Sequence, residues 1–126
     1  MLRAVAALSG LYDGVVGALL LFASGWFAST FNVAPASPPI FSDLNALFLL
    51  CIAAGYYLPW TEPERYRGYL WVMGPMLKGG GATLFIIHYV FGDAPASFLL
   101  FAASDGALAL LTLWALLRPA ALKAAN

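Results

Sequence analysis

The chain of 126 residues is 63% apolar and only 10% charged. Soluble domains have roughly 45–50% apolar and 25% charged residues, so this composition argues against a water-soluble fold. Six basic residues balance six acidic ones, which excludes the basic field that recruits nucleic acid, and the length is that of a single domain over residues 1–126.

Four apolar segments are each long enough to cross a bilayer, whose hydrocarbon core needs about 20 mainly apolar residues per helix. Only one or two ionisable groups interrupt each segment. We therefore predict an all-α, polytopic membrane protein whose four transmembrane helices form two hairpins. In chain order the predicted spans are residues 4–28, 40–60, 69–91 and 97–117.

The connections between these segments differ in composition. Prolines stop and restart helices around residues 32–39 in the first connection and around residues 91–95 in the last. Because both connections are short, the helices that they join should be antiparallel neighbours. In the middle connection Thr61 and Glu64 have the spacing of a capping box, which predicts that the third helix begins there with a polar turn.

Basic residues flank the predicted spans on one side only, because the first and last connections contain no lysine or arginine. Basic flanks remain in the cytoplasm. The sequence therefore predicts a protein of the cytoplasmic (inner) membrane with both termini in the cytoplasm. The flanking basic residues are Arg3, Arg65, Arg67, Arg118 and Lys123.

The first span contains an aspartate, Asp13, roughly 14 Å from its cytoplasmic end at a rise of 1.5 Å per residue. Glycines border this aspartate, and small residues at i±3 and i±4 let two helices approach closely. We therefore expect the first and third spans to pack together near the bundle axis. The bordering glycines are Gly10, Gly14 and Gly17.

The third span carries Lys78 at a similar depth, on a face with Gly74 and Gly81. Pro75 removes a backbone hydrogen bond one turn before this lysine, so the helix should be kinked there. The fourth span carries Asp105, roughly 12 Å from its outer end. A charge at such depth costs about 2.5–3.5 kcal/mol on insertion scales, so these groups should face the bundle interior and pair.

This charged cluster has two interpretations. In the functional one, Asp13 and Asp105 face a single ammonium, Lys78, and the unpaired carboxylate holds a proton or a cationic ligand. In the structural one, Lys78 and one aspartate form a closed ion pair that fixes helix register. The candidate hydrogen-bond partners of the cluster are Tyr12, Asn45 and Ser104.

Other polar residues have simpler explanations. Asp43 follows two prolines and is expected at the N-cap or in the first turn of the second helix, where an acid is favourable. His88 has no second His or Cys at ligand spacing, so we expect no metal site. The single cysteine, Cys51, is expected to be a small buried residue. The charged residues of the middle connection should form a solvated cytoplasmic surface.

The two halves of the chain also resemble each other. Asp13-Gly14 corresponds to Lys78-Gly79, and Ala-Pro-Ala-Ser occurs at 34–37 and again at 94–97. A duplicated hairpin would relate the halves by a pseudo-two-fold axis along the membrane normal. Chance similarity between Ala-, Gly- and Leu-rich segments is the alternative explanation. The last correspondence is Ser42-Asp43 with Ser104-Asp105.

The small size, the four spans and the glycine-rich first span with an embedded polar residue resemble the DoxX-like family of small bacterial membrane proteins. This resemblance covers the architecture of the whole chain and includes no specific motif. Asp13 departs from it, because DoxX-like proteins are expected to have a glycine followed by a lysine there. Small multidrug-resistance transporters are similar in placing an acid in the first of four spans, but Lys78 and Asp105 depart from their pattern.

Three functional hypotheses follow. The first is a non-catalytic membrane component, either an accessory subunit of a membrane complex or a binder of a lipid or other apolar molecule, in which the charges pair with no cavity around them. The second is a small proton- or cation-coupled transporter, which needs a water-accessible cavity reaching Asp13 or Asp105. The third, membrane-embedded acid–base catalysis, is disfavoured because no second polar cluster is present.

We favour the first hypothesis. The sequence contains no P-loop, Rossmann glycine pattern, HExxH or Ser-His-Asp set, so an enzyme is not favoured and no cofactor is expected. Membrane lipid is the expected partner, and assembly into a homo-oligomer or a larger complex is left open.

Overall fold

The computed structural model describes residues 1–119, which form helices and connections and contain no β-strand. Four helical segments in this part of the chain are long and apolar enough to cross a membrane. The all-α prediction and the number of long apolar helices are therefore confirmed. These segments are Leu2–Phe22, Ile40–Thr61, Arg67–Phe91 and Phe98–Leu117.

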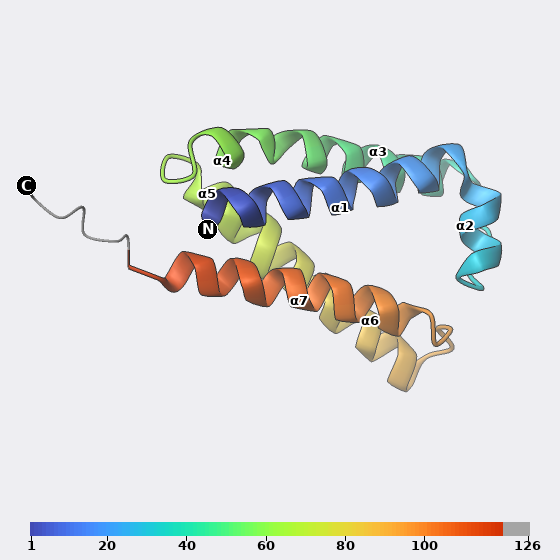
Figure 1. Cartoon of the computed structure of the whole chain (residues 1–126). Helices are drawn as coiled ribbons and strands as arrows, with labels where there is room; N and C mark the ends of the chain where they lie inside the picture. Colours follow the sequence, from blue (N-terminus) through green and yellow to red (C-terminus); the bar gives the residue numbers. More distant parts are fainter. Residues whose placement is uncertain (120–126) are drawn as a thin grey trace, which may run out of the picture.

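The first long helix, α1 (Leu2–Phe22), ends earlier than the predicted span 4–28. Ala23 leaves the helical conformation, with φ −133° and ψ 40°, and a separate short helix, α2 (Ser24–Thr30), follows it. Gly25 has low helix propensity, so the sequence does little to continue one helix through this point. Figure 1 shows α2 turned across the end of α1.

The second long helix consists of α3 (Ile40–Gly55) and α4 (Tyr57–Thr61), which meet at Tyr56. Pro59 explains the interruption. It has no N–H to donate to the Gly55 carbonyl, and its ring would clash with that carbonyl in a regular helix.

The middle connection does not contain the predicted capping box, so that prediction is wrong. Thr61 is the last residue of α4, and its hydroxyl donates to the carbonyls of Tyr57 and Leu58 at 3.1 and 2.9 Å. The reason is Pro63, because the residue before a proline is disfavoured in the α conformation, and Glu62 has φ −128° and ψ 72°.

The third long helix contains a π-helical segment, η1 (Val72–Lys78), between α5 (Arg67–Trp71) and α6 (Gly79–Phe91). Pro75 lies inside η1. In a regular α-helix its ring would clash with the carbonyl of Trp71, and the wider π winding relieves that contact. At Pro75, where the sequence predicted a kink, the structure has a π-helical segment.

The fourth long helix, α7 (Phe98–Leu117), packs against α6, just as α3 packs against α1. The helices joined by the first connection and those joined by the last connection are therefore antiparallel neighbours, as predicted. Figure 1 shows the two pairs close together at the end that holds the N-terminus and apart at the end that holds α2.

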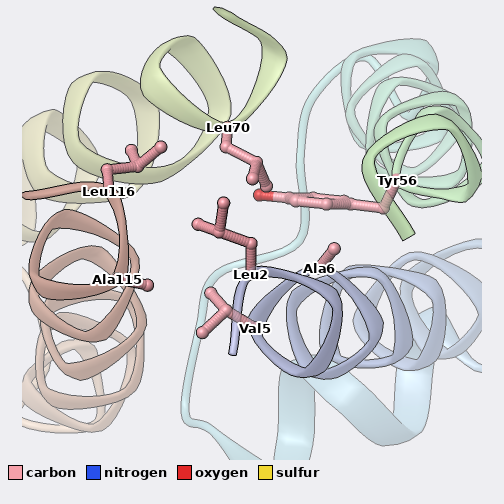
Figure 2. Close-up of a cluster of buried hydrophobic side chains, with 7 residues drawn as sticks. All are labelled: Leu2, Val5, Ala6, Tyr56, Leu70, Ala115 and Leu116. Atoms are coloured by element: carbon pink, nitrogen blue, oxygen red, sulfur yellow. The ribbon is translucent and has the colours of Figure 1, made fainter. Parts of the chain in front are cut away.

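We call the end that holds the N-terminus the closed end and the end that holds α2 the open end. The closed end contains the buried apolar core, to which all four long helices contribute. Leu2 and Ala6 of α1 meet Tyr56, at the junction of α3 and α4, and Leu70 of α5 (Figure 2). Alanines among these residues keep the helices near one another. The remaining members of the core are Val5, Ala115 and Leu116.

Arginines gather at this same end. The guanidinium of Arg3 donates to the Thr61 carbonyl at 3.0 Å, and that of Arg67 donates to the Leu116 carbonyl. Arg65 lies in the middle connection and Arg118 follows α7. Lys123, which was predicted to lie on the same side, is outside the described residues.

The charged side chains of the middle connection are paired along the chain. Arg65 bonds Glu62 at 3.3 Å, and Arg67 bonds Glu64 at 3.1 Å. Both acids and Arg65 are exposed, which agrees with the predicted solvated surface.

The glycines of α1 face a partner that the sequence did not indicate. A Cβ atom at Gly10 would lie 2.9 Å from Tyr56 Cβ, and one at Gly17 would lie 3.1 Å from Leu49 Cβ. Gly74, in the third long helix, faces Thr112 of α7. The predicted packing of the first span against the third through their glycines is therefore wrong, because glycine spacing identifies a closely packed face but not the helix that covers it.

Two single-residue expectations had opposite outcomes. Asp43 lies in the first turn of α3, as predicted. Cys51 is exposed, so its expected burial is wrong. The face of α3 that packs on α1 presents Leu49 and Ala53 to the glycines, and Cys51 lies outside that face.

We predict that Gly10→Ala destabilises the fold whereas Gly80→Ala does not. Both glycines lie inside helices, so both variants gain the same helix propensity. The new methyl group at residue 10 meets the fixed Cβ of Tyr56, and such overpacking costs about 1–3 kcal/mol. Gly80 has no atom within 4 Å of an added Cβ. Thermal unfolding of the two variants in detergent measures the difference, and equal melting temperatures would contradict the packing.

Candidate functional site

A buried ion pair joins the two helix pairs. The ammonium of Lys78, the last residue of η1, donates to Oδ1 of Asp13 in the middle of α1. The side chains are only 4% and 3% exposed, so neither charge is solvated by bulk water. In such surroundings each charge depends on the other for its stabilisation.

Asp105 of α7 brings a second carboxylate to the same ammonium. Its Oδ1 atom lies 3.8 Å from Lys78 Nζ, which is within ion-pair range but longer than a hydrogen bond. Its side chain is 19% exposed, more than either partner of the direct pair. The Lys78 ammonium is therefore within ion-pair range of two carboxylates, and it lies closer to that of Asp13.

Tyr12 covers the ion pair from one side. The Lys78 ammonium lies 5.0 Å from the centroid of the Tyr12 ring, which is within cation–π range. The Tyr12 hydroxyl is 2.6 Å from Oγ of Ser104 on α7. Since Ser104 donates its own proton to the Leu100 carbonyl at 2.9 Å, Tyr12 is the donor in this hydrogen bond, which links α1 to α7.

Three buried polar atoms near this cluster have no hydrogen-bond partner among the described residues. They are Oδ2 of Asp13, Oγ of Ser9 and the hydroxyl of Tyr56. Ser9 lies one helical turn before Asp13 on α1. An unsatisfied buried polar group costs about 1–3 kcal/mol, so a polar atom bound beside Asp13 Oδ2 would be held favourably.

A cavity of about 910 Å³ extends from the ion pair towards the open end of the molecule. Its base contains Asp13, Lys78 and Asp105, and its walls come from both helix pairs, from α2 and from the first connection. Most of the wall is apolar. The first hypothesis expected no cavity around the paired charges, and this expectation is wrong because the helix pairs diverge above the ion pair.

Aromatic rings close one side of the cavity. Phe27 of α2 and Phe31, which follows α2, pack on Phe101 of α7, with ring centroids 5.8 and 4.9 Å from the Phe101 centroid. Phe85 of α6 packs edge-on against Phe98 at 5.2 Å. These contacts hold α2 against the α6–α7 pair, at the end where Figure 1 shows the two pairs apart. The i, i+4 spacing of Phe27 and Phe31 is the sequence signal that could have revealed this cluster.

Five of the six residues predicted for the site lie together: Asp13, Lys78, Asp105, Tyr12 and Ser104. The sixth, Asn45, lines the cavity but makes no hydrogen bond to the ion pair.

Asp43 also lines the cavity, which the sequence did not indicate. Gly81 lines it beside Asp105, whose Oδ2 would lie 3.9 Å from a Cβ atom at residue 81. His88 is exposed, and residues 1–119 contain no group of three His, Cys, Asp or Glu side chains that could hold a metal ion.

Comparison with protein-family models, with characterised proteins and with solved structures finds no match to this chain.

We predict that Lys78→Met lowers stability strongly. The substitution leaves the buried Asp13 carboxylate without its counter-charge, and breaking a buried pair in this way costs about 3–5 kcal/mol. The double variant Lys78→Met, Asp13→Asn removes both charges and should recover much of the loss. Arg65→Met, which breaks the exposed pair with Glu62, is the control and should change little. The unfolding midpoints of the three variants measure these differences. If Lys78→Met is as stable as Arg65→Met, the buried ion pair does not contribute to stability.

Proposed function

We propose that this chain is an integral membrane protein that crosses the cytoplasmic membrane four times. Large apolar side chains cover its outside, among them Phe22 at 82% and Phe91 at 85% exposure. An apolar exterior of this extent is stable in lipid and prone to aggregate in water. The arginines at the closed end support a cytoplasmic location for that end and for both termini, because basic flanks are retained in the cytoplasm.

We further propose that it binds a lipid or another small molecule with an apolar body, without catalysing a reaction. The observation that carries this proposal is the cavity of about 910 Å³, which has apolar and aromatic walls and a charged base. Ligand sites have volumes of about 300–1,000 Å³ and combine apolar walls with a few convergent polar groups. The accessory-subunit form of the hypothesis gives no reason for such a space.

The proposed pseudo-two-fold repeat agrees with the geometry of the site. Asp13 and Lys78 occupy equivalent positions in the two halves and bond each other. Asp43 and Asp105 are also equivalent, and both line the cavity. An axis between the two hairpins would bring equivalent positions together in this way. A DoxX-like origin remains a proposal that involves the architecture alone.

A proton- or cation-coupled transporter is the second candidate, because the cavity reaches both Asp13 and Asp105. The core of Leu2, Tyr56 and Leu70 closes the opposite end. A transporter would have to open that core, whereas a binding protein would not.

Membrane insertion predicts an unusual pattern of cysteine reactivity. Cys51 is exposed on the isolated chain, so a membrane-impermeant maleimide would label it if the protein were surrounded by water. Inside a bilayer the same face of α3 is shielded by lipid. In intact cells we expect no labelling of Cys51 and strong labelling of Ser37→Cys in the outer connection, while Glu64→Cys reacts only after lysis. Labelling of Cys51 in intact membranes would contradict the proposed insertion.

Filling the cavity should displace its ligand. Gly81→Leu adds a side chain at the base of the cavity, where only Asp105 Oδ2 lies within 4 Å of the new Cβ. Gly80→Leu adds the same side chain to the neighbouring open surface and is the matched control. Native mass spectrometry of protein released from mild detergent should show a co-purifying apolar molecule on the wild type and on Gly80→Leu, and about tenfold less or none on Gly81→Leu.

An equal amount of bound molecule on both variants would show that the cavity is not the binding site.

If the protein is instead a proton- or cation-coupled transporter, a pH gradient should drive cation flux in liposomes, and Asp13→Asn should abolish this flux. A binding protein should give no such flux.

A further inference from the structure

The cavity contains more negative than positive groups. Its lining includes three carboxylates, those of Asp13, Asp43 and Asp105, and a single basic side chain, Lys78. Lys78 is buried and already bonded to Asp13. A ligand that entered this space would therefore meet surplus acid and no free cation in its lining.

We infer that the ligand of the cavity has a positively charged group, an ammonium, at one end of its apolar body. This inference rests on the proposed binding function and names the chemical class of the ligand. An anionic head, such as a carboxylate or a phosphate, would face Asp105 and Asp43 without a counter-charge and would lose its hydration. A cationic head would replace water with carboxylate oxygens.

Asp105 is the group that receives the ammonium. Its carboxylate stands 3.8 Å from Lys78 Nζ, without a direct hydrogen bond, and its side chain is partly exposed in the cavity. Asp13 Oδ2, which has no partner among the described residues, adds negative charge beside it. The base of the cavity thus has hydrogen-bond acceptors that the one lysine does not saturate.

The aromatic wall fits the same ligand. Phe101 lies one helical turn before Asp105 on α7, and Phe85 lies one turn after Gly81 on α6. Faces of aromatic rings attract cations and also pack against alkyl chains. With the ammonium at Asp105, the apolar body of the ligand would therefore lie against these rings. Asp43, which also lines the cavity, would add negative charge that attracts cations.

Three ligands with the same alkyl chain test this inference on the intact protein in a nonionic detergent: tetradecylammonium, tetradecanol and tetradecanoate. Native mass spectrometry gives the occupancy of each, and binding that survives in Gly81→Leu is subtracted as attachment outside the cavity. We expect the ammonium to bind at least about tenfold more tightly than the alcohol, and the carboxylate to bind most weakly.

Asp105→Asn should abolish the preference for the ammonium and leave binding of the alcohol unchanged. Because the Lys78–Asp13 pair remains in this variant, we expect it to fold, and its melting temperature checks this. Glu64→Gln removes an exposed acid outside the cavity and should keep the full preference.

Equal binding of the ammonium and the alcohol, or tighter binding of the carboxylate, would overturn the cationic ligand while the proposed binding function stands. If the preference for the ammonium survives in Asp105→Asn, Asp105 is not the residue that receives it. If none of the three ligands binds in a manner sensitive to Gly81→Leu, the binding function itself fails.

Discussion

The arrangement of this molecule depends on one buried ion pair, that between Lys78 and Asp13. It lies where the two helix pairs begin to diverge, between the buried apolar core and the cavity. In apolar surroundings neither charge can exchange its partner for water, so the pair fixes the register of α1 against the third long helix. The helices can then separate above it without losing their alignment.

Much of this fold could be predicted from hydrophobic length alone, because a helix in lipid must satisfy its backbone internally. The inward turn of Asp13, Lys78 and Asp105 followed from the cost of burying a charge. The identity of packing partners did not follow, since Gly10 and Gly17 mark a close contact without indicating that α3 forms it. The cavity could not be predicted from the sequence either, because it results from the divergence of the two helix pairs and not from a residue pattern.

Two prolines show how local chemistry shapes the larger arrangement. Pro59 divides the second long helix at Tyr56, whose ring then enters the core, and Pro75 lies in the π-helical segment that ends at Lys78. Both irregularities lie near the closed end, where residues from several helices must meet. Regular helices would lack these local changes of direction, and the break at Ala23 has a similar role at the open end, where it positions α2 beside α7.

The placement of the opposite charges on separate hairpins has a consequence for biogenesis. In a bilayer, a nascent first hairpin would expose Asp13 to lipid until the second hairpin delivered Lys78. The Asp13 carboxylate thus gains its counter-charge only when the second hairpin has been made. A chain truncated after the first hairpin would leave this carboxylate without a cationic partner.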